Sequence, residues 1–315
     1  MSTNQTIFIT GASGYIGMTL TKLAISSGYT IHALSRSETS DAKLSAVGAI
    51  PIRGDITTHD VLTREAAAAD IVINIADSIA GDYTIAMAER TRINNAAVDA
   101  LVAGLKGTGK ALIVTSGSLI TAPDPEGKET DESSPVTEDE LIPKMEEYAL
   151  GKQAEGVKIM AVRLAPYVYG NGGSGVALFM NMFHRKGSGF YVLPGTAKIT
   201  TVHVEDAARL YLLVAEKGRS GEKYNAAFET HVSQRELAEA IGRALGVEVH
   251  GLSSEEAGKQ LGSFFAQFLG SENRASGAKA KRELGWEVTV KEGILEDVAK
   301  GSYVEVAEGL KNGGK

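Results

Sequence analysis

Three glycines near the start of the chain have a spacing that suits the binding of a dinucleotide. Gly11, Gly14 and Gly17 stand three residues apart, between an apolar strand-like run and a helix-like run. Missing side chains at these positions allow a tight turn, the approach of a pyrophosphate and close packing of the helix. The backbone N–H groups of Gly14, Tyr15 and Ile16 would point at the phosphates from the positive end of the helix dipole. We therefore predict a dinucleotide site here, with a chance run of glycines as the alternative.

The residues at the end of the second strand-like run bear on the choice between NAD and NADP. An acidic residue at this place would accept both ribose hydroxyls and repel a 2′-phosphate. The chain instead has Ser35, Arg36 and Ser37. The Arg36 guanidinium offers a fork of donors to a phosphate, and the hydroxyls of Ser13, Ser35 and Ser37 could add further donors. The sequence therefore favours NADP over NAD, with a solvated surface arginine as the alternative.

Short apolar runs alternate with helix-length segments over the first half of the chain. The strand-like runs lie at 6–10, 30–34, 49–52, 71–75, 111–115 and 158–164. Such alternation predicts parallel strands that are buried between helices. The expected fold class is α/β, a Rossmann-type doubly wound parallel sheet with a smaller, interleaved C-terminal substrate lobe.

The regular alternation ends after Gly170, where a glycine-rich loop is followed mainly by helix-like runs. We expect residues 1–170 to form the dinucleotide-binding domain and residues 171–315 to form mainly the substrate-binding lobe, with residues 198–230 returning to the first domain. Helices are predicted at 138–155, 176–185, 205–216, 233–245, 254–268 and 278–284.

The glycine spacing and the chain length resemble those of the extended branch of the short-chain dehydrogenase/reductase superfamily, which includes NAD-dependent epimerase/dehydratase-like proteins. Further segments that resemble this branch lie at 54–56, 70–76, 115–118 and 202–207. The resemblance implies that Asp55 reaches the adenine amino group of the cofactor. It also implies that Ile56 and the backbone around Ala76 line the adenosine site.

Members of this family usually carry a tyrosine and a lysine four residues apart on the helix before the sixth strand. Tyr148 and Lys152 have this spacing, and Ser116 and Ser118 follow the fifth strand-like run. A lysine ammonium near a tyrosine lowers its pKa, so the phenol can donate a proton to a carbonyl oxygen while a hydride arrives from the nicotinamide. The resemblance thus implies that Tyr148 is the proton donor, Lys152 its pKa modifier, and Ser116 or Ser118 the hydrogen-bond partner of the substrate oxygen.

The position of Tyr148 leaves a second interpretation open. The helix from Tyr148 to about residue 155 would span only ~11 Å, whereas a five-residue strand beside it spans ~17 Å. Tyr148 could therefore sit too low to reach a nicotinamide at the carboxyl ends of the strands. Counting back from Arg163 by the usual family spacing leads to Leu141 and Met145, which can do no acid–base chemistry. Tyr167 or Tyr169 would then be alternative acids, unless they only line the core.

Composition narrows the class of partner. The formal net charge is -7 with no basic run, which argues against a nucleic acid or an anionic membrane and favours a small-molecule substrate. The chain has no cysteine, which excludes a thiolate nucleophile, and its six histidines lack metal-ligand spacing, so no metal is expected.

The first strand-like run begins within ten residues of the start, which leaves no signal peptide and favours the cytoplasm. The resemblance implies that a homodimer is possible.

Two classes of function remain. The first is an NADP-dependent oxidoreductase that acts on a carbonyl or alcohol of a small or medium-sized organic substrate, with epimerisation or dehydration as a neighbouring possibility. The second is a catalytically altered NADP(H)-binding regulator or sensor, which the doubtful position of Tyr148 suggests.

Overall fold

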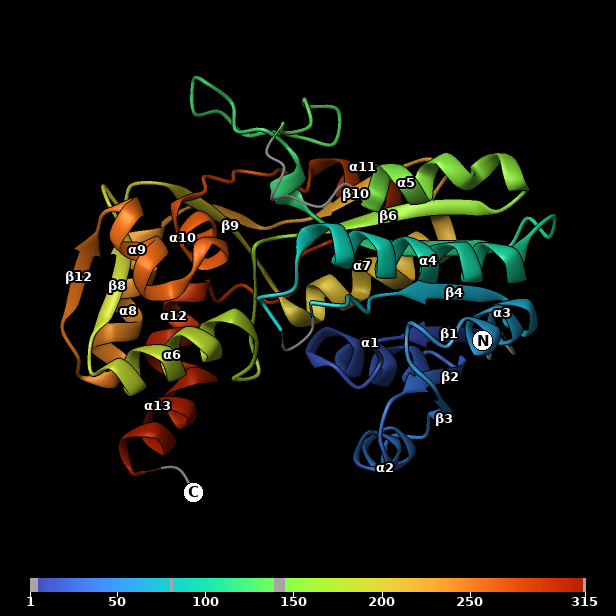
Figure 1. Ribbon diagram of the computed structural model, residues 1–315, viewed down its shortest axis with the longest axis horizontal. Coiled ribbons are helices and arrows are strands. Elements are labelled where there is room, and N and C mark those ends of the chain that lie inside the picture. Colours follow the sequence, from blue (N-terminus) through green and yellow to red (C-terminus); the bar gives the residue numbers. More distant parts are fainter. Residues whose placement is uncertain (1–4, 80–81, 139–144, 314–315) are drawn as a thin grey trace.

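The computed structural model describes residues 5–79, 82–138 and 145–313. A seven-stranded parallel sheet forms its centre, with strand order β10-β6-β5-β4-β1-β2-β3 (Figure 1). The strands are β1 (Thr6–Thr10), β2 (Thr30–Ser35), β3 (Ile50–Arg53), β4 (Ile71–Asn74), β5 (Ala111–Gly117), β6 (Lys158–Leu164) and β10 (Lys223–Ala226). The Rossmann-type doubly wound sheet expected from the sequence is thereby confirmed. The six predicted strands are all present, with ends that agree within two residues.

Helices cover both faces of this sheet, because its strands are apolar on both sides. One face carries α1 (Tyr15–Ser26), α7 (Val204–Lys217) and α11 (Ala278–Leu284), which share a core with Ile7 and Ile9. The other face carries α3 (His59–Ala68), α4 (Met87–Leu105) and α5 (Met145–Leu150), whose core includes Phe8 and Leu112. The short helix α2 (Glu38–Ala46) connects β2 to β3.

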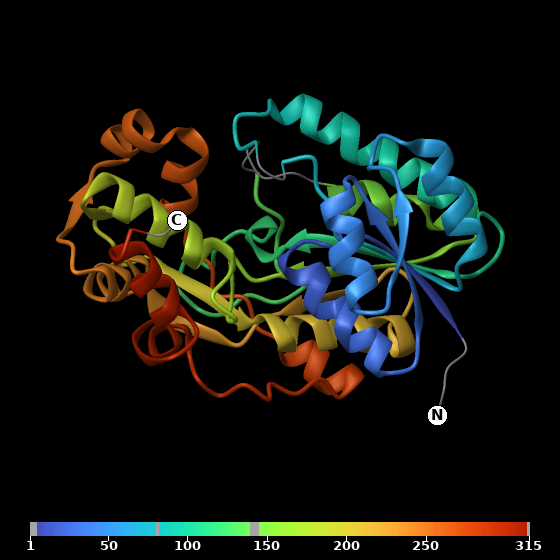
Figure 2. The same cartoon turned by 90° about the horizontal axis from the view of Figure 1, so that it is seen from below.

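A second, smaller lobe has its own core and lies to one side of the sheet (Figures 1 and 2). Its helices are α6 (Ser174–Lys186), α8 (Gln234–Leu245), α9 (Ser254–Leu261), α10 (Ser263–Gly270), α12 (Ile294–Lys300) and α13 (Tyr303–Lys311). Its strands are β7 (Tyr167–Tyr169), β8 (Gly189–Val192), β9 (Lys198–His203), β11 (Glu229–Ser233) and β12 (Val249–Leu252). They form a three-stranded sheet, β11-β9-β7, and a two-stranded sheet, β12-β8.

The two parts exchange segments along the chain. β10 and α7, from the second half of the sequence, belong to the central sheet and its covering layer, as does α11. The predicted helix 254–268 is interrupted at Gly262, whose φ of +87° separates α9 from α10. The predicted helix 138–155 is partly outside the described residues, and from Met145 it runs as α5 and then as a 3-10 turn over Gly151–Glu155. Among the described helices, none is long and apolar enough to span a membrane.

The strand order reverses between β1 and β4, since consecutive crossovers go to opposite sides of this point. Ligands of open α/β sheets bind at such a switch point, beyond the carboxyl ends of the strands. In this fold the glycine turn after β1, the ends of β4 and β5, and helix α10 of the smaller lobe border that region.

Candidate active site

The glycine turn after β1 is shaped by backbone contacts that leave no room for side chains. Gly11 has a φ of +73°, and a Cβ there would lie 2.9 Å from the Ala76 nitrogen. A Cβ on Gly17 would lie 2.1 Å from the Gly11 carbonyl oxygen. The first glycine therefore permits the turn to lie against the end of β4, and the third permits α1 to start close to it. This is the cradle that a pyrophosphate requires.

A cavity of about 570 Å³ lies beside this turn. Its walls include most of the residues that the sequence predicted for cofactor binding: Gly11, Ser13, Gly14, Tyr15, Ile16, Gly17, Arg36, Asp55, Ile56 and Ala76. Ser35 and Ser37 do not belong to this wall. The Ser35 hydroxyl donates to the Ser37 carbonyl at 3.3 Å, and the Ser37 hydroxyl accepts the Ser40 N–H at the start of α2. The phosphate-binding role predicted for these two hydroxyls stays a prediction without support from this geometry.

Asp55 is held as an ionised carboxylate at the rim of this first cavity. Its Oδ1 accepts hydrogen bonds of 2.7 Å from both the hydroxyl and the backbone N–H of Thr57. The Thr57 hydroxyl is the largest cause of a lowered pKa, which the Thr58 contacts reinforce against a smaller effect of burial. A carboxylate in this position is an acceptor, as the predicted contact with an adenine amino group needs.

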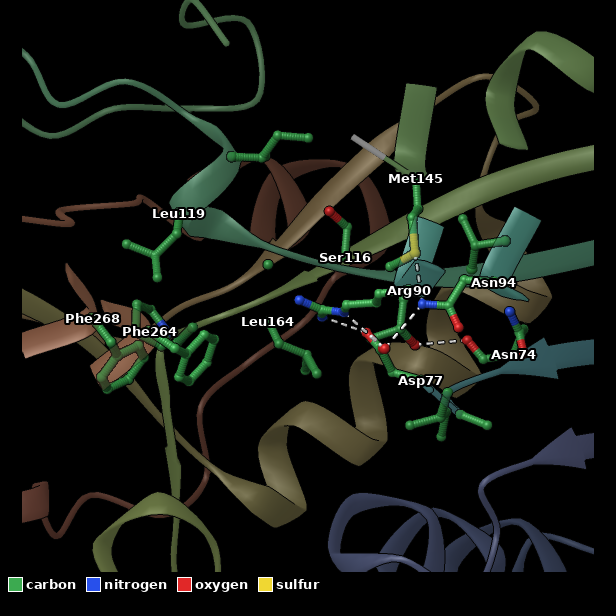
Figure 3. A pocket seen from close by; sticks show the side chains of 18 of the residues that line it. Asn74, Asp77, Arg90, Asn94, Ser116, Leu119, Met145, Leu164, Phe264 and Phe268 are labelled. Carbon is green, nitrogen blue, oxygen red and sulfur yellow. Dashed lines mark hydrogen bonds and ion pairs between the residues drawn. The ribbon is translucent and has the colours of Figure 1, made fainter. Parts of the chain in front are cut away.

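A second cavity of about 320 Å³ adjoins the first, since Ile75, Ala76 and Asp77 line both. Figure 3 shows this second cavity. Its polar end lies at the carboxyl end of β4. Here Arg90 donates to both oxygens of Asp77, from Nε at 2.9 Å and from Nη2 at 2.5 Å. Asn94, one helical turn further along α4, donates to Asp77 at 2.9 Å and accepts the Ser78 N–H at 3.0 Å.

The charge state of Asp77 follows from these contacts. Burial acts to raise its pKa, but the Arg90 guanidinium, the Ile79 N–H and the Asn94 amide outweigh burial, and the net pKa is lowered. Asp77 is therefore a carboxylate at neutral pH and cannot act as a proton donor.

The two serines after β5 have different surroundings. Ser116 lines the second cavity. Ser118 is fully buried, where its hydroxyl donates to Asn273 Oδ1 at 2.7 Å and its carbonyl accepts the Asn273 side-chain N–H at 3.0 Å. Ser116 therefore is placed to meet a ligand, whereas Ser118 ties the end of β5 to the segment after α10.

The predicted pair Tyr148 and Lys152 lines neither of these two cavities. The Tyr148 hydroxyl donates to Asp99 Oδ2 at 2.7 Å, and the Lys152 Nζ lies 2.6 Å from Asp99 Oδ1. Asp99 is nine residues further along α4 than Arg90, or about 14 Å at 1.5 Å per residue. The contact with Asp99 also raises the pKa of Tyr148, which is the opposite of activation. Proton donation by Tyr148 stays a prediction that this geometry does not support.

Near the family's expected position, Met145 at the start of α5 lines the second cavity, and its sulfur accepts the Asn94 amide at 2.9 Å. Leu141 lies outside the described residues. The hydroxyls of the other two candidate acids are hydrogen-bonded within the protein. The Tyr167 hydroxyl donates to the Gln234 side chain at 2.9 Å, and the Tyr169 hydroxyl donates to the Glu292 carbonyl at 2.6 Å.

Sequence reasoning missed the polar group of Asp77, Arg90 and Asn94. Two signals could have indicated it. Asp77 directly follows Ala76 beyond the fourth strand, where ligands of such sheets bind. Arg90 and Asn94 are four residues apart, so they share one face of the next helix.

Comparisons with known proteins agree with this geometry. The sequence profile of the NAD dependent epimerase/dehydratase family matches residues 7–227. An uncharacterized protein of Schizosaccharomyces pombe is 32% identical over 299 residues, which cover 94% of this chain and 99% of that protein. The 4-hydroxy-2-methyl-3-oxo-4-farnesyl-3,4-dihydroquinoline-1-oxide ketoreductase of Stigmatella aurantiaca is 26% identical over 320 residues, which cover 91% of this chain and 94% of the enzyme.

A solved structure shares the fold. The dTDP-glucose 4,6-dehydratase of Bacillus anthracis, in complex with NAD, has a TM-score of 0.74 and 16% identity, with 96% of each chain covered. The match to the family profile spans more than half of the chain and includes the glycine turn and the ends of β4 and β5. On this evidence the chain belongs to the NAD dependent epimerase/dehydratase family.

Proposed function

We propose that the protein is an NADP-dependent oxidoreductase that interconverts a carbonyl group and an alcohol on a small or medium-sized organic substrate. The observation that carries this proposal is the junction of the two cavities at Ile75, Ala76 and Asp77. A ligand of the second cavity and a dinucleotide in the first would meet at this junction. The near full-length similarity to a ketoreductase supports the same type of reaction.

The preference for NADP is supported by Arg36, which lines the first cavity at the end of β2. Its planar guanidinium suits a 2′-phosphate, whereas NAD enzymes usually place an acidic residue there to bind the ribose hydroxyls.

A cofactor held beside Gly11, Gly14 and Gly17 would supply the hydride that converts a carbonyl carbon into an alcohol carbon, and the carbonyl oxygen would take a proton from solvent. The Ser116 hydroxyl and the Arg90 guanidinium are the groups that we assign to hydrogen-bond the substrate oxygen. Asp77 orients Arg90, and preorganised donors of this kind stabilise the negative charge that develops on the oxygen.

The test is NADPH oxidation, followed by absorbance, with a panel of aldehydes and ketones. We expect turnover that falls roughly 100-fold in Arg90→Met and less in Ser116→Ala, with the Kd for NADPH unchanged. Tyr148→Phe is the matched control and should keep wild-type turnover. Tight NADPH binding without turnover of any carbonyl would reject the enzyme proposal.

That outcome would favour the second candidate, an NADP(H)-binding regulator. The observation behind it is the engagement of Tyr148 and Lys152 by Asp99, outside both cavities. Epimerisation or dehydration of a nucleotide sugar is a third possibility, which fits the family name. It is less well supported, because Arg90 is the only cation among the described residues of the second cavity and is already paired with Asp77. A homodimer stays a prediction that light scattering would test.

A further inference from the structure

An aromatic wall stands opposite the polar end of the second cavity. Phe264 and Phe268 line the cavity from α10, one turn apart, with stacked rings whose centroids are 6.4 Å apart and whose planes differ by 12°. Figure 3 shows both rings on the side of the cavity away from Arg90 and Asp77. Tyr83 packs on Phe264 with a centroid distance of 5.3 Å. Flat apolar groups therefore have a surface to stack on, at a distance from the only charged groups of the described lining.

Most of the remaining lining is apolar, and Asn74, Thr115, Gln267 and Ser271 are its further polar members. The apolar part includes Val98, Val114, Leu119, Ile120, Met145, Leu164, Ala165 and Pro166. An aliphatic and aromatic wall of this kind stabilises a ligand through apolar area removed from water.

The charges of the second cavity compensate one another. Arg90 and Asp77 form a two-point ion pair, and both side chains are mostly buried, at 11% and 24% exposure. A phosphate or carboxylate on the ligand would have to compete with Asp77 for Arg90, and it would lose its hydration on entering an apolar site. The described lining contains no second cation to offset this cost.

Ser116 and Arg90 can bind a ligand oxygen at the polar end of the second cavity. The Asn94 amide is already engaged, because its nitrogen donates to Asp77 and Met145 and its oxygen accepts from Ser78. Arg90 uses Nε and Nη2 on Asp77, and its Nη1 has no hydrogen bond to a described residue. Ser116 and this Nη1 are two donors of the lining that can meet a ligand oxygen. A single carbonyl oxygen matches such a pair of donors.

From this arrangement we infer the substrate class: an uncharged, aromatic ketone or aldehyde, whose ring stacks on Phe264 and Phe268 and whose oxygen reaches Arg90 and Ser116. The inference rests on the proposed function and adds the substrate class to it.

The experiment compares neutral and charged members of one chemical series. Aryl methyl ketones of one to three fused rings are assayed with NADPH beside the same ketones that bear a ring carboxylate, and beside UDP-glucose. We expect kcat/KM to be at least about 10-fold higher for the neutral ketones, in line with the cost of burying an unpaired charge. Equal or better turnover of the carboxylates, or turnover of UDP-glucose, would overturn the inference.

Two phenylalanine variants identify the surface that selects the ring. Phe264→Ala should lower kcat/KM for the neutral ketones by roughly 10-fold and leave the Kd for NADPH unchanged. Phe265→Ala is the matched control, because this neighbour on α10 packs on Tyr83 and Phe179 and does not line the cavity. Equal effects of the two variants would mean that the aromatic wall does not contact the substrate.

Failure of the enzyme proposal gives a different result from failure of the substrate class. If no ketone is turned over, binding of the same series to the NADP⁺-loaded protein is measured by calorimetry. Binding of the neutral ketones that is weakened by Phe264→Ala would retain the ligand class and reject only the chemistry. No binding of neutral ketones, or a preference for the carboxylates, would reject the ligand class itself.

Discussion

Arg90 and Asp77 form a two-point ion pair where the first and second cavities adjoin, with N–O distances of 2.9 and 2.5 Å. The two residues come from different elements, since Asp77 follows β4 and Arg90 lies in the first turn of α4. Their contact fixes the chain beyond β4 against α4. It also makes a positive group available beside the switch point of the sheet.

The first prediction concerns the pH dependence of this pair. The pKa of Asp77 is lowered in the folded state, so its stabilising effect is present above about pH 4, its ordinary range, and is lost as the pH falls through the folded-state pKa. Asp77→Asn should therefore lower the free energy of unfolding by about 2 kcal/mol at pH 7, and by less near pH 3. Urea denaturation at both pH values measures the difference. Glu89→Gln, which removes an exposed partner of Arg92 on the same helix, is the control. A difference that does not change with pH would contradict the assignment.

The second prediction concerns the cofactor phosphate. Arg36→Ala should weaken NADPH binding by about 10-fold to 100-fold and leave NADH binding nearly unchanged, because a charged hydrogen bond contributes about 1.5–3 kcal/mol. Fluorescence titration with both cofactors gives the two Kd values. Arg53→Ala is the matched control, since Arg53 ends the neighbouring strand β3 and pairs with Asp41 instead of lining the cavity. Equal losses for NADH and NADPH would show that Arg36 does not contact the 2′-phosphate.

The third prediction separates the two serines after β5. Ser116→Ala should lower kcat and leave the midpoint of thermal unfolding unchanged, because its side chain lines the cavity. Ser118→Ala should keep kcat and lower stability by about 1–3 kcal/mol, because it leaves the buried Asn273 Oδ1 without the hydroxyl that donates to it. Steady-state kinetics and thermal melts on the same preparations test both. The reverse pattern would place the catalytic hydroxyl at Ser118.

The fourth prediction concerns the buried pair that anchors α5. Arg163 donates to both oxygens of Glu146 at 2.8 Å, and both side chains are almost fully buried. Glu146→Gln should destabilise the fold by about 3–5 kcal/mol, because it leaves a buried charge unpaired. The double variant Glu146→Leu/Arg163→Met should recover much of this loss. Urea denaturation of both variants measures their free energies of unfolding. A Glu146→Gln variant as stable as the wild type would mean that water reaches Arg163.

Local patterns in the sequence were sufficient for the sheet and the glycine turn. An apolar run such as Ile7–Ile9 predicts a buried strand from the sequence alone. The close contacts that require glycine at positions 11 and 17 also arise within one strand–turn–helix unit. Arg36 could likewise be placed at the end of β2, where it lines the first cavity, and its contact with a 2′-phosphate stays a prediction. These features depend on neighbours in the sequence, so they could be predicted without knowing the fold.

Other features depend on segments that are distant in the sequence. Tyr148 and Lys152 have the spacing of a catalytic pair, yet the short α5 places them at Asp99 and away from the cavities. The edge strand β10 was not predicted, and it forms because the chain returns to β6 after the lobe has begun. The acidic side chain of Glu132 is buried, and it accepts the N–H of the distant Asn225 at 2.7 Å.

The sequence by itself therefore determined the cofactor class, the doubly wound sheet and the place of the glycine turn, because periodicity, propensity and turn geometry are local. Only the tertiary structure decided which side chains meet at the second cavity. The pairing of Asp77 with Arg90, and the approach of Phe264 and Phe268 from the other lobe, depend on how α4 and α10 pack. Residue spacing along a chain does not specify such packing, because contacts between distant segments depend on how all the side chains of the core pack together.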